Sequence, residues 1–314
     1  RYIKDCVDSL LKQDFPKEEM EWIFVDGRST DKTLALLKQA QGEHPSLIHV
    51  LDNPHKTVPY AMNIGINASK GHYIVRMDAH AQYAPDYISQ CVKCLEETGA
   101  DNVGGVMETK SRSFTGNAIA RMLSSKFGVG GSQFRVGGES GYVDTVPFGA
   151  FRREVFSRWG GYDERLTRNQ DNEMNYRIRK NGGKIYLSEK INLSYYCRDT
   201  IGGIVRMAVQ NGKWNIITMK LCPGSMGLRH FVPFAFLCSL IVLPLLSLLT
   251  SFFWWVLLAE LVLYLLLDVL FSVQAAGQAK YIPLLLFLFP CFHLTYGFGS
   301  LLGLFAAVKY KREK

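Results

Sequence analysis

Polar and apolar positions follow two different patterns along this 314-residue chain, and the change falls near residue 230. In the first part, short apolar runs typical of buried strands alternate with segments whose apolar residues recur at helical spacing. From 231 to 308, apolar residues are nearly continuous, and the fully charged side chains are Glu260, Asp268 and Lys280. The pattern predicts a soluble α/β part followed by a membrane-embedded part.

The first part is predicted to form a layered α/β fold. Apolar runs predict strands at 21–26, 48–51, 73–77, 101–108 and 184–187, and helical spacing predicts helices at 3–11, 32–43, 60–68, 85–97, 153–159 and 169–179. Strands that alternate with helices in this way predict a mostly parallel sheet with right-handed crossovers. Ligands of such sheets bind beyond the carboxyl ends of the strands, which is where Asp26 and Asp78 fall.

The stretch from Tyr73 to His80 is the centre of this pattern. It is an apolar run that ends on Asp78, with His80 two residues later. In a strand, residues i and i+2 point to the same side, so the two groups would leave the strand end together. They are plausible ligands for a divalent cation, and the histidine suits Mn²⁺ better than Mg²⁺. An aspartate at a strand end is also an ordinary turn signal, so the metal site is a hypothesis at this point.

Charge and cysteine content narrow the range of partners. The formal charge is +8 and most of it precedes residue 231, which suits anionic ligands or an anionic membrane face and is too diffuse to indicate nucleic acid. Seven cysteines without paired spacing favour a reducing compartment. Cys91 and Cys94 form a C-x-x-C motif, but no second pair of cysteines or histidines follows at the spacing of a zinc site. We therefore interpret them as two thiols one helical turn apart. The chain starts at Arg1 inside an amphipathic pattern, and we expect it to be part of a longer protein.

Two polar motifs follow later in the chain. The helix predicted at 169–179 carries acidic residues in its first turn, among them Asp171, and the helix dipole alone would favour them there. Gln210, Lys213 and Trp214 stand just ahead of the hydrophobic part. Trp214 could be an anchor at the membrane interface or a stacking surface for a sugar ring.

Together these motifs resemble the family 2 glycosyltransferases, inverting enzymes with a GT-A fold, and especially the membrane-anchored bacterial members that build exopolysaccharides such as succinoglycan. The segment 25–31 is similar to the family's strand-end motif, which implies that Asp26 contacts a uracil ring, although Gly27 replaces the usual second aspartate. The segment 78–80 is similar to the family's Asp-x-Asp site. That similarity implies that Asp78, with His80 as a second ligand, holds the metal and through it the diphosphate.

Two later segments complete the resemblance. Gln170-Asp171 is similar to the family's Glu-Asp pair, which implies that Asp171 is the catalytic base. The Gln210-x-x-Lys213-Trp214 segment is similar to a Gln-x-x-Arg-Trp motif near the acceptor and the donor phosphates. Here lysine keeps the charge of the usual arginine but loses its bidentate fork.

The resemblance also implies a domain organisation and a reaction. It implies a GT-A domain over 1–215, with the family's first strand preceding Arg1, then an interfacial linker over 216–230, two or three transmembrane helices within 231–308 and a basic tail over 309–314. The implied reaction is the inverting transfer of a hexose from a nucleotide diphosphate sugar, expected to be a UDP-hexose, to a lipid-linked saccharide. The implied cofactor is a divalent metal, Mg²⁺ or Mn²⁺, and no nucleic-acid partner is expected.

The hydrophobic part predicts a multi-pass protein of the inner (cytoplasmic) membrane. Residues 231–272 are about twice the roughly 20 residues of one crossing, which predicts a hairpin, and 281–308 could cross once more. An enzyme that uses nucleotide sugars is expected to keep its catalytic domain in the cytoplasm. The basic tail also favours that side, although three crossings would place it outside. Glu260 and Asp268 lie near one helix face, and His293 could partner one of them.

Two alternatives remain open. The acceptor could be a polyprenyl phosphate, whose oxygen is already ionised and needs no base. The departures at Gly27, His80 and Gln170 would also suit a membrane-tethered nucleotide-binding protein without transferase activity.

Overall fold

The computed structural model describes residues 3–79 and 81–310, and the chain divides into two compact units. The first unit comprises the residues up to Glu108 together with Gly137–Tyr195. The second comprises Thr109–Val136 and the chain from Tyr196 onward.

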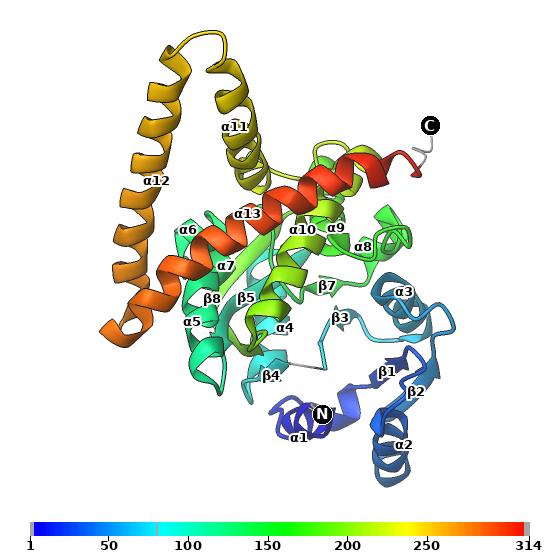
Figure 1. Ribbon diagram of the computed structural model, residues 1–314. Coiled ribbons are helices and arrows are strands. Elements are labelled where there is room, and N and C mark those ends of the chain that lie inside the picture. Colours follow the sequence, from blue (N-terminus) through cyan, green and yellow to red (C-terminus); the bar gives the residue numbers. More distant parts are fainter. Residues whose placement is uncertain (1–2, 80, 311–314) are drawn as a thin grey trace. The chain divides into compact units, whose positions relative to one another are not determined.

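The first unit holds the strands of the described residues, apart from the last residues of β5 and β8, with helices between them (Figure 1). Its elements are α1 (Ile3–Leu11), η1 (Lys17–Glu19), β1 (Trp22–Asp26), α2 (Thr33–Glu43), β2 (Ile48–Asp52), α3 (Val58–Ala68), β3 (Tyr73–Val75), β4 (Ala81–Tyr83), α4 (Tyr87–Thr98), β5 (Asn102–Lys110), β6 (Gly141–Tyr142), β7 (Ala150–Arg152), α8 (Glu154–Trp159), α9 (Gln170–Lys180) and β8 (Ile185–Tyr196). The predicted elements are present within a few residues, except that the strand predicted at 184–187 continues to Tyr196.

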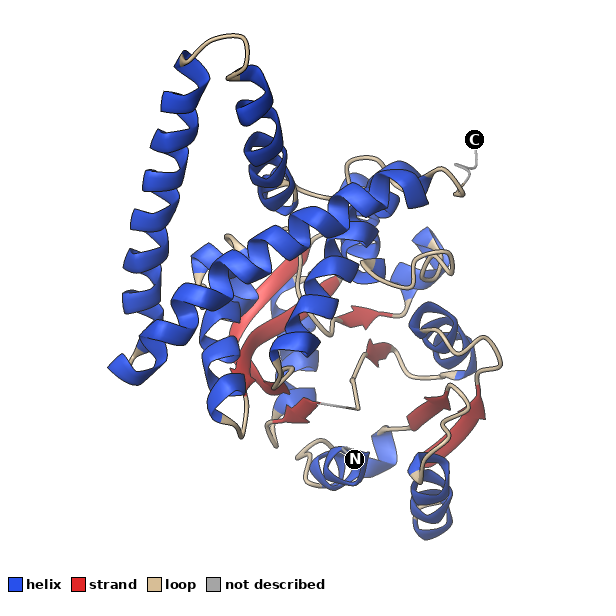
Figure 2. Ribbon diagram, in the orientation of Figure 1, coloured by secondary structure: helices blue, strands red, loops and turns tan. Residues whose placement is uncertain are grey.

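The strands form two sheets (Figure 2). β1 and β2 pair in parallel, with Trp22 beside Ile48 and Asp26 beside Asp52. In the larger sheet the order is β3, β7, β5, β8, β4, with β6 beside β8. The predicted α/β class is confirmed, but parallel pairing is less extensive than expected, because β7 is antiparallel to β3 and β5, and β8 is antiparallel to β4 and β6. Strands that enter a sheet without a crossover helix can pair in this direction.

Helix boundaries in the first unit have local causes. The Asp31 carboxylate accepts a hydrogen bond from the Thr33 backbone N–H at 2.9 Å, which closes the turn just ahead of α2, whose N-cap residue is Lys32. α4 ends at Gly99, whose φ of 64° lies in the left-handed region that glycine adopts without strain.

Apolar side chains of α1, α2, β1 and β2 pack into one buried cluster, which contains Ile3, Cys6, Val7, Leu10, Trp22, Leu37, Ala40, Leu47 and Ile48.

The described part of the second unit is helical apart from the ends of β5 and β8. Its helices are α5 (Phe114–Leu123), α6 (Lys126–Val129), α7 (Gln133–Val136), α10 (Ile201–Leu221), η2 (Leu228–His230), α11 (Val232–Leu246), α12 (Phe252–Ala276), η3 (Ala279–Tyr281) and α13 (Ile282–Ala307). α11 and α12 form an antiparallel hairpin (Figure 1). Two stretches are long and apolar enough to cross a membrane, Phe252–Ala276 and Ala279–Ala307, whereas α11 is shorter, at 15 residues.

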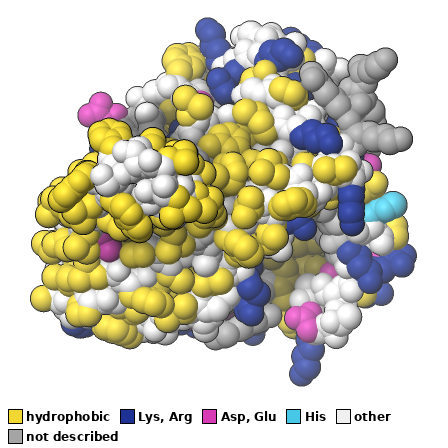
Figure 3. Space-filling model, turned by 45° about the horizontal axis from the view of Figure 1, so that its top comes forward, with side chains coloured by type: hydrophobic (Ala, Val, Ile, Leu, Met, Phe, Trp, Pro, Cys, Tyr) yellow, Lys and Arg dark blue, Asp and Glu magenta, His cyan; other side chains and the backbone are white. Residues whose placement is uncertain are grey.

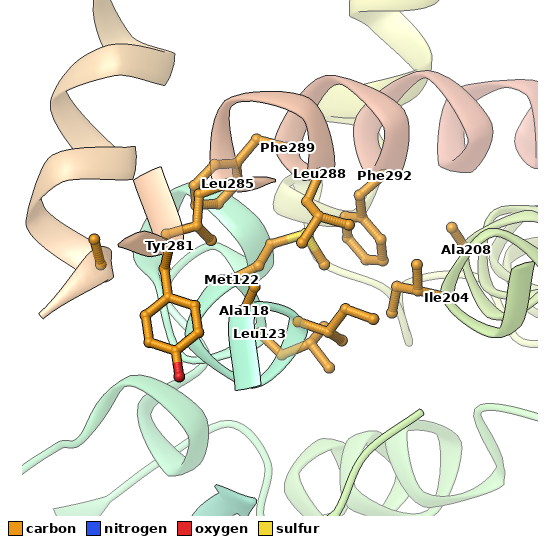
Figure 4. Packing of buried hydrophobic residues seen from close by; sticks show 12 residues of the cluster. Ala118, Met122, Leu123, Ile204, Ala208, Tyr281, Leu285, Leu288, Phe289 and Phe292 are labelled. Atoms are coloured by element: carbon orange, nitrogen blue, oxygen red, sulfur yellow. The ribbon is translucent and has the colours of Figure 1, made fainter. Parts of the chain in front are cut away.

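The core of the second unit lies where α13 meets α5 and α10. Figure 4 shows side chains of α13 directed toward those of the other two helices. All the residues of this core are buried, and burying a large apolar side chain contributes about 1.5–3 kcal/mol. The cluster comprises Ala118, Ile119, Met122, Leu123, Ile204, Ala208, Ala276, Tyr281, Leu285, Leu288, Phe289 and Phe292.

His293 has different partners from those considered in the sequence. Its ring nitrogens lie 2.8 Å from the Tyr264 hydroxyl and 2.9 Å from the Phe127 carbonyl oxygen, and neither Glu260 nor Asp268 is among its hydrogen-bond partners. Tyr264 is four residues from each of these two acids and so lies on the same side of α12. The tyrosine therefore takes the place on α12 that was expected for an acid.

We predict that Gly105→Ala destabilises the first unit. Gly105 lies on β5, and a Cβ there would come within 1.7 Å of the Ile191 carbonyl oxygen of β8, so the backbone of one strand would have to move. Overpacking of this kind lowers the free energy of unfolding by about 1–3 kcal/mol. The midpoint of thermal unfolding of the detergent-solubilised protein measures it.

The matched control is Gly42→Ala on α2, where the added Cβ meets nothing within 4 Å. This change should raise the free energy of unfolding by up to about 1 kcal/mol, since alanine favours helix. Equal midpoints for the two variants would contradict the close strand contact.

Candidate active site

A buried arginine lies at the end of β3 in the first unit. Arg76 is 7% exposed, and its backbone N–H donates to the Gly149 carbonyl oxygen at 3.0 Å. Its Nε lies 3.3 Å from Oδ1 of Asp78, and its guanidinium carbon lies 5.8 Å from the centre of the Phe148 ring. A cation held away from water in this way requires anionic or polar partners.

Asp171 belongs to the same electrostatic cluster as Asp78. Burial alone would lower the pKa of Arg76, but the Asp78 carboxylate, with contributions from Tyr162 and Asp171, raises it above the ordinary value for arginine. Burial also raises the pKa of Tyr162 to about 12, against the opposing effect of Arg76. The predicted metal ligand Asp78 therefore contacts this guanidinium directly, and the predicted base Asp171 is among the charges that act on it.

Tyr162 is held in place by its backbone. The Asn63 side chain of α3 accepts from the Tyr162 N–H at 2.8 Å and donates to the Tyr162 carbonyl oxygen at 2.9 Å. Arg177 of α9 donates to the carbonyl oxygens of Trp159, Gly160 and Gly161 and forms an ion pair with Glu173 at 2.8 Å. The helix that carries Asp171 is therefore tied to the turn that carries Tyr162.

Asp171 is the second residue of α9. The helix begins after Asn169, whose φ of 61° is unusual for a residue with a side chain. The Asp171 carboxylate accepts from the Asn172 N–H at 2.9 Å, and a negative charge in the first turn is favoured by the helix dipole. Gln170 is 8% exposed, and its Oε1 atom is buried without a hydrogen-bond partner among the residues that the structure describes.

Asp78 is positioned by β4. Its backbone N–H donates to the Tyr83 hydroxyl at 2.5 Å, which anchors the segment that follows β3. His80, the predicted second metal ligand, lies outside the described residues. Over 3–79 and 81–310, no three His, Cys, Asp or Glu side chains gather in a way that could hold a metal ion. Asp78 fits a Mg²⁺-like cation that takes one or two protein carboxylates and completes its shell from water and substrate phosphates.

Asp26 ends β1, as predicted, and already has partners. Its two carboxylate oxygens accept from the Ser29 hydroxyl at 2.6 Å and from the Ser29 N–H at 3.0 Å, which closes the loop after the strand. The neighbouring loop is attached to it, because the Asn53 N–H donates to the Asp26 carbonyl oxygen at 2.8 Å. Each carboxylate oxygen keeps further lone pairs, so contact with a nucleobase stays a prediction.

Two cationic residues follow β1 and β2 with backbone angles that the sequence did not indicate. Arg28 has φ 59° and Lys56 has φ 61°, a conformation that costs residues with side chains about 1–2 kcal/mol. Arg28 also forms an exposed ion pair with Asp52 at 2.9 Å. Arg76 was missed as well, although a charged residue inside the apolar run 73–77 is a recognisable signal of a buried ion.

Gln210, Lys213 and Trp214 lie on α10 and belong to the second unit. Gln210 is exposed and Lys213 partly so, and their spacing of three places them on one helix face. Trp214 is buried, with its ring edge-on to Tyr310 at a centroid distance of 5.8 Å. A role for these residues beside the acceptor or the phosphates stays a prediction.

Two known proteins are similar in sequence to this chain. A protein of Methanococcus voltae is 28% identical over 95% of this chain and 92% of its own length, and is described as dolichyl N-acetyl-alpha-D-glucosaminyl phosphate 3-beta-D-2,3-diacetamido-2,3-dideoxy-beta-D-glucuronosyltransferase. The succinoglycan biosynthesis protein ExoA of Rhizobium meliloti is 32% identical over 68% of this chain and 65% of its own length.

Solved structures also resemble this one. The mannosyltransferase PcManGT from Pyrobaculum calidifontis, in complex with GDP-Man and Mn²⁺, covers 98% of this chain and 83% of its own, with a TM-score of 0.64 and 18% identity. TarS 1–349 from S. aureus, in complex with UDP-GlcNAc, covers 99% of this chain and 89% of its own, with a TM-score of 0.51 and 16% identity. These likenesses concern the fold, and they confirm the predicted GT-A class.

The family model described as glycosyl transferase family 2 matches residues 1–160. This match includes β1 with Asp26, β3 with Arg76 and Asp78, and the turn that leads to Tyr162. The chain belongs to glycosyltransferase family 2.

Proposed function

We propose that this glycosyltransferase moves a hexose, with inversion, from a UDP-sugar to a lipid-linked saccharide in polysaccharide synthesis. The observation that carries the proposal is the cluster in which Asp78 and Asp171, from a strand end and a helix start, both act on the buried Arg76 guanidinium. One carboxylate is then available on the donor side and the other on the acceptor side of a single reaction centre.

In the proposed reaction Asp171 is the general base. The acceptor hydroxyl oxygen forms a bond to the anomeric carbon while the bond from that carbon to the diphosphate oxygen breaks. The hydroxyl proton passes to the Asp171 carboxylate. A single displacement of this kind inverts the anomeric centre. The unpartnered Oε1 of the neighbouring Gln170 is suited to accept a hydrogen bond from a second acceptor hydroxyl.

On the donor side, Asp78 would hold a divalent cation, Mg²⁺ or Mn²⁺, with His80 as a proposed second ligand. When bound, such a cation stabilises the negative charge that develops on the leaving diphosphate. Asp26 would contact the uracil ring. Gln210 and Trp214 would contact the acceptor, and Lys213 would bind a phosphate as a point charge.

The lipid-linked acceptor and the membrane location support each other. The names of the two similar proteins refer to a dolichyl phosphate substrate and to succinoglycan biosynthesis. A lipid-linked substrate requires an enzyme at the membrane surface, and the apolar helices of the second unit provide the attachment. We place the protein in the cytoplasmic membrane as a multi-pass protein with its catalytic domain, proposed for 1–215, in the cytoplasm, where nucleotide sugars are made.

We predict that Asp171→Asn abolishes sugar transfer and leaves donor binding intact. The amide cannot accept the proton, and loss of a general base lowers turnover by about 10²–10⁴-fold. Turnover is measured as UDP release with the acceptor, and donor affinity by isothermal titration.

The control is Glu154→Gln, which removes an exposed ion pair with Arg158 on α8 and should leave turnover unchanged. A polyprenyl phosphate acceptor is already ionised, so substantial activity in Asp171→Asn would favour that acceptor over a sugar hydroxyl.

We predict that Arg76→Met lowers kcat by about 100-fold or more, the size of effect expected when a fixed electrostatic partner is lost. Without the cation, the negative charges of the half-buried Asp78 and Asp171 would no longer be offset. Arg76→Lys keeps the charge and should retain more activity than Arg76→Met at a similar unfolding temperature.

The matched control is Arg158→Met, where the arginine is exposed. Equal kcat values for Arg76→Met and Arg158→Met would show that the buried cation does not organise the site.

We predict that one member of a panel of UDP-sugars gives a lipid-extractable product with Mn²⁺ or Mg²⁺. The Asp78→Ala variant should not form this product. The assay uses membranes that contain the full-length parent protein together with their lipid extract. UDP binding without turnover of any donor by the unmutated protein would instead support the nucleotide-binding protein without transferase activity.

A further inference from the structure

We propose that the α11–α12 hairpin is the part of 231–308 that crosses the bilayer, and that α13 stays on the side of the membrane that holds α10. The tip of the hairpin, 247–251, would then lie on the far side, and the C-terminal tail on the near side. The inference rests on the proposed membrane attachment, and it replaces three crossings by two.

α12 has the length and surface of a spanning helix. Its 25 residues extend about 37 Å, which exceeds the roughly 30 Å of hydrocarbon in a bilayer. Only 17% of its most apolar stretch is buried by the rest of the protein. Apart from Gln274 near its end, its exposed large side chains are apolar, and Figure 3 shows apolar side chains over this part of the surface. They are Phe252, Trp254, Trp255, Leu258, Leu261, Val262, Leu263, Leu265, Leu266, Val269, Leu270 and Val273.

The two acids of α12 have partners inside the protein. Glu260 accepts from the Ser239 hydroxyl of α11 at 2.6 Å, which links the two helices of the hairpin. Asp268 is 3% exposed and accepts from the Ser272 hydroxyl at 3.3 Å. Acids in spanning helices are found where they face protein and are hydrogen-bonded. Both acids of the hairpin meet this condition, so its outward surface can be covered by lipid.

The ends of the hairpin suit the two membrane surfaces. Trp254 and Trp255 are exposed close to the tip, whose sequence includes Ser247, Thr250 and Ser251. Exposed tryptophans are enriched at membrane interfaces. About 22 residues of helix, or roughly 33 Å, separate these tryptophans from Gly277, which matches one full crossing. At the other end of the hairpin, η2 precedes α11 and contains the basic residues Arg229 and His230.

The backbones of α13 and α10 pack in close contact. A Cβ on Gly212 of α10 would come within 2.0 Å of the Tyr296 carbonyl oxygen of α13. A Cβ on Gly299 of α13 would come within 2.1 Å of the Val209 carbonyl oxygen of α10. The backbones of the two helices therefore touch, and Lys220 adds a hydrogen bond to the Ala307 carbonyl oxygen at 2.7 Å.

α10 is unsuited to the hydrocarbon interior. It carries Arg206, Lys213 and Lys220, and it is not one of the helices that are apolar enough to span. Because the two backbones are in contact, α13 could not cross the bilayer without taking these three cations with it. Moving charged side chains into hydrocarbon is strongly unfavourable. α13 is therefore held with α10 outside the hydrocarbon.

Three exposed phenylalanines of α13 form a strip. Phe287, Phe298 and Phe305 are 11 and 7 residues apart, which returns them to nearly the same helix face, while Leu302 and Leu304 are exposed to either side of it. The opposite face packs against α5 in the core of Figure 4, and 44% of the most apolar stretch is buried. α13 is apolar on both faces, so the face that does not pack against the protein suits contact with lipid. The strip would rest on lipid headgroups and upper acyl chains.

Reporter fusions in the full-length parent protein test the topology. Green fluorescent protein after Lys314 should fluoresce, because it folds to a fluorescent state on the cytoplasmic side. Alkaline phosphatase inserted between Leu249 and Thr250 should be active, because it works only on the far side. Active phosphatase fused after Lys314, or inactive phosphatase at the tip beside a fluorescent tip fusion, would overturn the two-crossing topology. Release of the unmodified protein by alkaline carbonate would instead show that the proposed membrane attachment fails.

Two arginine substitutions at similarly exposed positions give a second test. Leu266 of α12 is 62% exposed and Phe305 of α13 is 71% exposed. Leu266→Arg should reduce carbonate-resistant protein several-fold, since its position is in the hydrocarbon. Phe305→Arg should leave it nearly unchanged, because an arginine at the surface can reach water. Equal losses in the two variants would place α13 in the hydrocarbon and contradict the proposal.

Discussion

A guanidinium that is buried must have its charge balanced nearby, and in the first unit that guanidinium is Arg76. The Asp78 carboxylate is in direct contact with it, and the Asp171 carboxylate adds negative charge from the start of α9. The end of β3 and the start of α9 thus both bear on one buried charge. The contacts of Asn63 and Arg177 fix the turn after α8 from two other helices. The arrangement gives a transferase two carboxylates in fixed positions before any substrate binds, which is what electrostatic preorganisation requires.

Polar side chains within the apolar helices of the second unit also have partners. Glu260, Asp268 and His293 each have a hydrogen-bond partner within the helices, although Oε2 of Glu260 has none among the described residues, and the outer surface of the hairpin is mainly apolar. A surface of this kind suits the membrane attachment proposed above. The fold is that of a family 2 glycosyltransferase, and the proposed attachment would place it beside the proposed lipid-linked acceptor.

The element order could be predicted because strand and helix periods are local properties of the chain. The strand ends at Asp26 and near Asp78 and the helix start at Asp171 were recognised in this way. Strand direction in the larger sheet was not, because periodicity is the same for parallel and antiparallel pairs. Arg76 was overlooked because its importance comes from Tyr162 and Asp171, which are far from it in the sequence. The left-handed backbone of Arg28 and Lys56 has no sequence signal, since neither is glycine or asparagine.

The sequence by itself determined the α/β pattern, the apolar character of 231–308, the resemblance to family 2 glycosyltransferases and the residue types available for catalysis. Each of these depends on neighbours along the chain. Only the tertiary structure decided that Asp78 and Asp171 act on one guanidinium and that α13 lies against α10. The charge balance of a buried group depends on which residues, distant in the sequence, surround it in the fold. The contact between α10 and α13 depends on glycines of the two helices that meet across their interface.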